Sequence, residues 1–253
     1  MRIAIPLVLV LAAGPAALKD VDIVEKLGAQ IPADLAFLDQ TGQVVRLGDS
    51  FHRGRPLLLV LGYHRCPMLC PLLLGGVERA LRGTGWRAGR DFDALTVSFD
   101  PSEGPADAAE KRRGFAQSIG LAESDPAWPF LTGSIESIRA LTDAIGFRYR
   151  YDPESKQFAH AAAIFVLTPA GTVSRYLYGV TFEPRDLRFA LVEAAAGRAG
   201  PTLDRVLFQC FRYNPASRRY EVFVRSWFRI GGLIIFVAVA GLLVSLARRG
   251  SAR

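Results

Sequence analysis

Sulfur and imidazole side chains are scarce in this chain of 253 residues, which contains only three cysteines, three histidines and two methionines. Three cysteines are too few for a fold that disulfides hold together, and the odd number leaves one cysteine unpaired. The chain also lacks internal repeats and low-complexity tracts. Its length and composition suit one globular domain of ordinary size with additional segments at its ends.

A basic run interleaved with aromatic residues is also missing, although the net charge is +7 and arginine greatly outnumbers lysine. A basic chain can bind nucleic acid, but without such a run we expect no nucleic-acid partner. A domain held beside anionic lipid explains the charge more simply.

The N-terminus has the pattern of a secretory signal. Arg2 precedes an apolar stretch over residues 3–13, and small residues follow at 12–17. We therefore predict a signal peptide over residues 1–17, cleaved near its end. The alternative is an N-terminal membrane anchor that is not cleaved. A signal peptide and an anchor would both export the rest of the chain.

The C-terminus has the pattern of a membrane span. Residues 230–247 contain no charged side chain. The length of this uncharged stretch is about the minimum for a bilayer-spanning helix. Trp227 and Phe228 precede the stretch at the position of an aromatic belt, and Arg248 and Arg249 follow it. We predict a single C-terminal transmembrane helix in the inner membrane, with the domain on the periplasmic side.

The two ends therefore divide the chain into five predicted segments. These are a signal peptide (1–17), an exported domain (18–200), a juxtamembrane segment (201–229), a transmembrane helix (230–247) and a cytoplasmic tail (248–253).

Within the exported domain, apolar patterns of strands and helices alternate. We expect a hairpin over 31–47, strands over 57–63, 92–100, 161–169 and 172–179, and helices over 71–81, 105–120, 134–147 and 183–196. This order predicts an α/β sandwich with a mainly parallel central sheet and an N-terminal hairpin.

Cys66 and Cys70 lie in the stretch "GYHRCPMLCP", between the apolar strand and the first predicted helix. The start of a helix offers free N–H groups and the positive end of its dipole, which stabilise a thiolate and lower the pKa of a cysteine. Two cysteines that merely pack would rarely stand so close together on a loop flanked by prolines. We therefore expect this pair to carry chemistry.

The spacing leaves two kinds of chemistry open. Thioredoxin-like enzymes have two residues between their cysteines, whereas here there are three. A disulfide can still close across the wider turn, so Cys66 and Cys70 are candidates for a redox-active disulfide. Two thiolates can also face a common soft metal such as copper or zinc, which then needs a third ligand.

His160 is the candidate for this third ligand. It directly precedes an apolar strand, at the place where a thioredoxin-like fold brings a residue against the cysteine loop. His64 is expected to point away, and His52 lies in a polar turn. The cysteine loop contains no Asp or Glu. Two thiolates and a neutral imidazole suit Cu(I) and also accommodate Cu(II).

The motifs "GYHRCPMLCP", "SFDP" and "HAAAIFVLTPAGTVSRYLYG" resemble the Sco/SenC family of copper-binding proteins, which assist the assembly of cytochrome c oxidase. The resemblance covers roughly residues 31–196. It implies a thioredoxin-like fold and a copper site formed by Cys66, Cys70 and His160. Asp100 of "SFDP" matches an acidic family position near the site, as a possible auxiliary residue.

The chain departs from the family at two points. Met68 occupies a loop position that is commonly acidic, and the predicted anchor is C-terminal rather than N-terminal, as in a bacterial subgroup. Cys210 is the odd cysteine, and we interpret it as a buried, inert residue, with a resolving thiol or accessory ligand as the alternative.

Three functions follow from this reading. The first is a membrane-tethered copper metallochaperone that serves the copper-bearing oxidase subunit or another copper client, supplied by a copper donor protein. The second is a thiol–disulfide oxidoreductase that reduces a client's metal-site cysteines and is itself regenerated by a thiol reductant. The third is a peroxidase-like enzyme using Arg65. We expect the metallochaperone, which would not be an enzyme.

Overall fold

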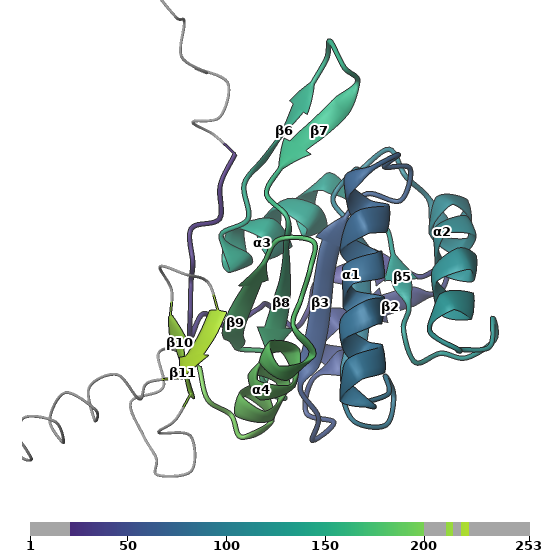
Figure 1. The fold of residues 1–253 in the computed structure, drawn as a ribbon. Helices are drawn as coiled ribbons and strands as arrows, with labels where there is room; N and C mark the ends of the chain where they lie inside the picture. Colours follow the sequence, from purple (N-terminus) through teal and green to yellow (C-terminus); the bar gives the residue numbers. More distant parts are fainter. Residues whose placement is uncertain (1–20, 200–210, 215–218, 223–253) are drawn as a thin grey trace, which may run out of the picture. The chain divides into compact units, whose positions relative to one another are not determined.

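The computed structural model describes residues 21–199, 211–214 and 219–222 (Figure 1). The predicted signal peptide, membrane helix and tail, together with Cys210, lie outside these residues and remain predictions. Among the helices that are described, none is long and apolar enough to cross a bilayer.

The chain divides into two compact units, residues 1–200 and 201–253. In the second unit, β10 (Phe211–Asn214) and β11 (Arg219–Val222) form an antiparallel pair. The sequence pattern predicts only a juxtamembrane segment over residues 201–229, so this hairpin is an addition to the predicted elements.

The first unit contains nearly all of the predicted elements. Its strands are β1 (Ala36–Leu38), β2 (Val44–Arg46), β3 (Leu57–Gly62), β4 (Asp93–Ser98), β5 (Phe130–Leu131), β6 (Tyr149–Asp152), β7 (Gln157–His160), β8 (Ala163–Leu167) and β9 (Val173–Tyr178). Its α-helices are α1 (Leu69–Thr84), α2 (Pro105–Ser118), α3 (Ile135–Ile145) and α4 (Pro184–Ala195), and a 3-10 helix covers Leu47–Ser50.

Local signals account for several of these elements. The β1–β2 turn is closed by the carboxylate of Asp39, which accepts hydrogen bonds from the backbone N–H groups of Thr41 and Gln43. Helix α3 begins after Ser134, whose hydroxyl accepts a hydrogen bond from the N–H of Ser137, and ends at Gly146 in the left-handed region. The predicted hairpin and helix are therefore confirmed.

The central sheet is mixed, which corrects the predicted mainly parallel sheet. Its strand order is β5-β4-β3-β8-β9, with β3, β4 and β5 parallel and β8 antiparallel to both of its neighbours. The reason lies in the β6–β7 hairpin, which the sequence analysis missed. It ends at His160, beside Tyr63 at the exit of β3. Because β8 starts there, it runs against β3.

Helices cover both faces of this sheet. Figure 1 shows α1 and α4 side by side over one face, with the β6–β7 hairpin projecting beyond the top of the sheet. On the other face, Leu59 and Leu61 of β3 pack in one buried cluster with Leu141 and Ile145 of α3. All six residues of β3 are buried, because successive side chains point to opposite covered faces.

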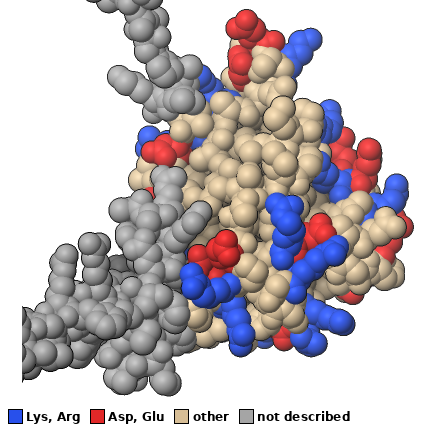
Figure 2. Space-filling view, viewed as in Figure 1, with Lys and Arg blue, Asp and Glu red and all other residues tan. Residues whose placement is uncertain are grey.

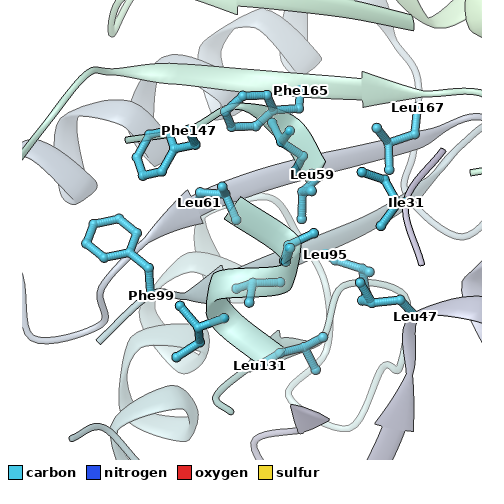
Figure 3. Close-up of a cluster of buried hydrophobic side chains, with 14 of the residues drawn as sticks. Ile31, Leu47, Leu59, Leu61, Leu95, Phe99, Leu131, Phe147, Phe165 and Leu167 are labelled. Atoms are coloured by element: carbon cyan, nitrogen blue, oxygen red, sulfur yellow. The ribbon is translucent and has the colours of Figure 1, made fainter. Parts of the chain in front are cut away.

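The buried cluster continues to the end of the sheet where the cysteines lie. Figure 3 shows Phe99, Phe147 and Phe165 at one edge of the cluster, with Ile31, Leu47 and Leu167 at the other edge. Phe99 and Phe147 also contact the ring of His160. The same packing that stabilises the sheet therefore also supports the candidate site.

One buried ion pair joins the sheet to a helix. The Nη2 atom of Arg175 in β9 lies 2.9 Å from Oε2 of Glu193 in α4, and both side chains are almost fully buried. Removing one partner leaves an uncompensated buried charge, whereas replacing both partners by apolar residues does not.

We predict that Glu193→Ala lowers the free energy of unfolding by about 3–5 kcal/mol, measured by urea denaturation. The double variant Arg175→Met/Glu193→Leu serves as the control and should recover most of that loss. If the single and double variants are destabilised equally, the loss does not come from an unpaired buried charge, and the prediction is wrong.

Candidate functional site

The cysteine loop, residues 63–70, connects the end of β3 to the first turn of α1. Cys66 lies in the loop, and Cys70 is the second residue of the helix. Both are buried, with 5% of each residue exposed. Gly62 makes room for the second thiol, since a Cβ atom there would lie only 2.8 Å from Cys70 Sγ. The predicted placement between strand and helix is confirmed.

The two sulfur atoms are in hydrogen-bond contact with the loop and with each other. The N–H of Cys70 donates to Cys66 Sγ, and the N–H of Tyr63 donates to Cys70 Sγ, each at 3.4 Å. Both cysteines are free thiols. The sulfurs are thus held on the same short stretch of chain, close enough to share a hydrogen bond.

This arrangement makes the two thiols unequal. A hydrogen bond from the Cys70 thiol, supported by the N–H groups of Cys70 and Met68 and by the Tyr63 hydroxyl, lowers the pKa of Cys66 to about 4 against the effect of burial. The same thiol contact and burial raise the pKa of Cys70. Cys66 is therefore the thiolate at neutral pH, and Cys70 is the thiol that donates to it.

Tyr63 connects the thiolate to the histidine. Burial, together with its hydrogen bond to Cys66, raises the pKa of the Tyr63 hydroxyl. Its ring also contacts the imidazole of His160 edge-on, with centroids 6.2 Å apart. Tyr63 thus contacts both Cys66 and His160.

His160, the last residue of β7, is held in an aromatic pocket. Its ring contacts Tyr63, Phe99 and Phe147, and burial lowers its pKa, so the imidazole is neutral at pH 7. Its Nδ1 atom lies 3.0 Å from the carbonyl oxygen of Ala161. Since a carbonyl only accepts, Nδ1 carries the proton and Nε2 keeps its lone pair. Metal-binding histidines commonly have this arrangement.

Three candidate ligands are nevertheless not gathered around one point. In the part of the chain that the structure describes, no three Cys, His, Asp or Glu side chains lie close enough together to hold a metal ion. Cys66 and Cys70 are brought together, and His160 lies one tyrosine away. A shared ion would require the imidazole and the thiols to come closer together than they are here.

The other two histidines lie where the sequence predicts. The Nε2 atom of His64 is 3.1 Å from the carbonyl oxygen of Leu131, and its ring packs against Phe130, away from the sulfurs. Burial lowers the pKa of His64. His52 is exposed.

Asp100 lies close to the cysteine loop but acts first as a turn residue. Its Oδ1 atom accepts hydrogen bonds from the N–H and hydroxyl of Ser102, and Oδ2 lies 3.4 Å from Nη2 of Arg65. Asp100 therefore touches the loop through Arg65. Met68, in contrast, is 69% exposed beside the buried thiols.

Glu103 is a site residue that the sequence analysis missed. Its carboxylate is completely buried and accepts hydrogen bonds of 2.6 Å from the N–H groups of His64 and Arg65 and from the hydroxyl of Ser98. These two N–H groups immediately precede Cys66. No motif predicts this role, because an acidic residue just before a helix is usually a solvated cap. Only the fold brings the residue under the loop.

A mixed α/β fold with a reactive thiol pair between a buried strand and a helix defines a thioredoxin-like protein with a dithiol site. The model of the SCO1/SenC family matches residues 25–194. The chain therefore belongs to the SCO1/SenC family, as its motifs predict. No curated protein sequence matches the chain.

Solved structures support the same fold. A protein of Aquifex aeolicus VF5 is 26% identical, with a TM-score of 0.59, over 68% of this chain and 96% of its own. Copper-bound ScoI of Arabidopsis thaliana is 20% identical, with a TM-score of 0.53, over 66% and 99% of the two chains. BsSco, a Sco-family cytochrome c oxidase assembly protein with a disulfide switch, is 22% identical, with a TM-score of 0.50, over 68% and 98%.

We predict that Cys66 alkylation by iodoacetamide reaches its full rate above about pH 5, because the thiolate forms with a pKa of about 4. Cys70→Ala removes the strongest hydrogen bond to the thiolate and should shift the midpoint to higher pH. Mass spectrometry of the Cys66 peptide measures both rates. An unchanged midpoint in the variant would show that Cys70 does not stabilise the thiolate.

We also predict that Glu103→Gln loosens the cysteine loop, because the amide nitrogen would face an N–H donor in place of an acceptor. Hydrogen bonds to charged groups contribute about 1.5–3 kcal/mol, so exchange of the His64 and Arg65 amides should accelerate by roughly 10–100-fold. Hydrogen–deuterium exchange of the segment that contains His64 and Arg65 measures these amide exchange rates. The control, Glu110→Gln on the exposed side of α2, should leave it unchanged.

Proposed function

We propose that this protein is a copper metallochaperone, tethered to the membrane by its C-terminal segment, that assists assembly of the copper site of cytochrome c oxidase. One observation carries the proposal: Tyr63 contacts both a thiolate that has a thiol neighbour and a neutral imidazole whose Nε2 keeps its lone pair. Membership in the SCO1/SenC family supports it, as do a copper-bound relative and a relative from oxidase assembly.

Copper would be the cargo of Cys66, Cys70 and His160. Thiolates are soft ligands, and together with imidazole they suit Cu(I) and accommodate Cu(II). Because the Cys70 thiol is protonated, uptake of the ion would release a proton. The hydrogen bond from Nδ1 to the Ala161 carbonyl would hold the ring with Nε2 available.

Tethering fits this role. A domain on the periplasmic side of the inner membrane is confined to the layer that contains the oxidase, which raises its effective concentration at the copper-bearing subunit. A separate donor protein would supply the copper. Asp100 would act as an auxiliary residue by orienting Arg65 beside the loop.

Thiol–disulfide exchange is a second candidate function, which the asymmetry of the two thiols favours. The Cys66 thiolate attacks a client disulfide, forms a mixed disulfide and releases one client thiolate. Cys70 then loses its proton and attacks Cys66 Sγ, which releases the second client thiolate and leaves a Cys66–Cys70 disulfide. A thiol reductant would return the pair to the dithiol state.

The decisive experiment is a copper titration of wild type and His160→Ala, read by the thiolate-to-Cu(II) absorption band. We expect copper affinity to fall by about 100-fold or more, because losing even a residue that only supports a ligand costs roughly 10–100-fold. The exposed histidine variant His52→Ala is the control and should bind like wild type.

The same variant separates the two functions. His160→Ala should still reduce a model disulfide, because both thiols remain. If the wild-type protein binds no copper but reduces disulfides, the oxidoreductase function is supported. Normal oxidase assembly in a His160→Ala strain would rule out the chaperone role of this site.

A further inference from the structure

A cleft lies beside the cysteine loop. Its volume is about 1160 Å³. Its lining includes Arg65 and Pro67, the two neighbours of Cys66 in the chain, and residues of the β6–β7 hairpin. A molecule in this cleft would therefore lie directly against the loop that holds the thiolate.

Aromatic side chains from one face of the hairpin line this cleft. Tyr149 and Tyr151 lie two residues apart in β6, so their side chains point to the same face of the hairpin. Phe158 of β7 pairs directly with Tyr151, so its side chain points to that face as well. Tyr151 is 49% exposed. Large aromatic rings that stay accessible in a concave site are typical of the anchor points of protein interfaces.

Positive charge surrounds this aromatic surface. Arg139 of α3, Arg148 before β6 and Lys156 in the hairpin turn all line the cleft, and all are exposed. Among the described residues, none of these three side chains forms an ion pair with a carboxylate. With Arg65, the lining holds four cations against two carboxylates, Asp100 and Asp143.

The second cleft of the domain does not share this excess of positive charge. This cleft of about 1050 Å³ lies at the opposite end of β3, and its lining holds as many carboxylates as arginines, five of each. Three of these arginines, Arg55, Arg82 and Arg90, form ion pairs. Figure 2 shows a face where Lys and Arg side chains gather over α1 and α4 with Asp and Glu among them. The hairpin cleft stands out because the cations of its lining outnumber the carboxylates by four to two.

We infer that this hairpin cleft is the docking surface for an acidic, extended segment of the protein that exchanges copper with this one. The inference rests on the proposed function only for the partner's role. The four cations come from separate segments, namely the cysteine loop, α3, the residue before β6 and the hairpin turn. Cations on separate segments suit several carboxylates along a chain better than a single small anion. A flat bilayer surface cannot enter a concave site to reach its aromatic lining.

Docking here would have a direct use. The thiols are buried, so a partner must come close before copper can move between ligands. An acidic segment in the cleft would contact Arg65 and Pro67 on either side of Cys66 and the hairpin that carries His160. Unpaired cations would also steer the encounter and make it sensitive to ionic strength.

The test uses the full-length protein and a fluorescein-labelled 12-residue peptide in which glutamate alternates with small and aromatic residues. Peptides with lysine or glutamine at the glutamate positions are the ligand controls. The cleft variant is Arg139→Glu/Arg148→Glu/Lys156→Glu. The matched control, Arg79→Glu/Arg87→Glu/Arg188→Glu, changes the net charge equally with exposed arginines outside the hairpin cleft.

By fluorescence anisotropy, we expect the acidic peptide to bind wild type in a salt-sensitive manner and at least about tenfold more weakly to the cleft variant. The control variant should bind within twofold of wild type. Tyr151→Ala should weaken binding several-fold without changing its salt dependence. If the cleft variant is unfolded by circular dichroism, Lys156→Glu and Tyr151→Ala serve in its place.

Other results would overturn the assignment. Equal loss in both charge variants, or equal binding of the glutamine peptide, would show that the cleft does not select an acidic segment. Loss of binding to phosphatidylglycerol vesicles in the cleft variant alone, with unchanged peptide binding, would assign the surface to the membrane instead. Copper titration of the same samples separates the docking proposal from the metallochaperone proposal. If the protein takes up no copper but its cleft still binds the acidic peptide, only the metallochaperone proposal is refuted.

Discussion

The carboxylate of Glu103 determines how the chain leaves β3 and enters the cysteine loop. Two backbone N–H groups directly before Cys66 would be buried without partners if this carboxylate were absent. An unsatisfied buried donor is costly, so the carboxylate and the loop conformation depend on each other. The loop in turn sets the position of Cys66 relative to the start of α1, and with it the hydrogen bonds that stabilise the thiolate.

The aromatic cluster fixes the other half of the site. Phe99 follows β4, Phe147 follows α3, and both contact His160 as well as the hydrophobic core. Because the ring of His160 packs on side chains that also stabilise the sheet, the imidazole is held near the thiols without being bonded to them. The hairpin that carries it forms a separate two-stranded sheet, so its attachment to the domain rests on this packing rather than on strand pairing with the central sheet.

Short-range patterns predicted the parts of this site that lie close together in sequence. The apolar run of β3, the helix pattern that follows it and the spacing of Cys66 and Cys70 placed the thiols correctly, and the topology of a thioredoxin-like fold brought His160 to the same end of the sheet. The mixed sheet was not predicted, because the β6–β7 hairpin that reverses the chain before β8 lies outside the central sheet and its aromatic residues pack on the site. Glu103 was missed for a related reason: its partners are backbone N–H groups about 40 residues away, and no side-chain pattern records them.

The burial of the thiols and the exposure of the hairpin cleft are related, because a buried site can be reached only from a surface beside it. A thiolate that is to hold copper without losing it to water, or to avoid unselective oxidation, is best buried, and both cysteines are. Burial also prevents a partner's ligands from reaching the sulfurs. A surface that recognises the partner beside the loop resolves this conflict, because access then depends on docking. The exposed Tyr151 and the cations Arg139, Arg148 and Lys156 surround the entrance that such a partner would use.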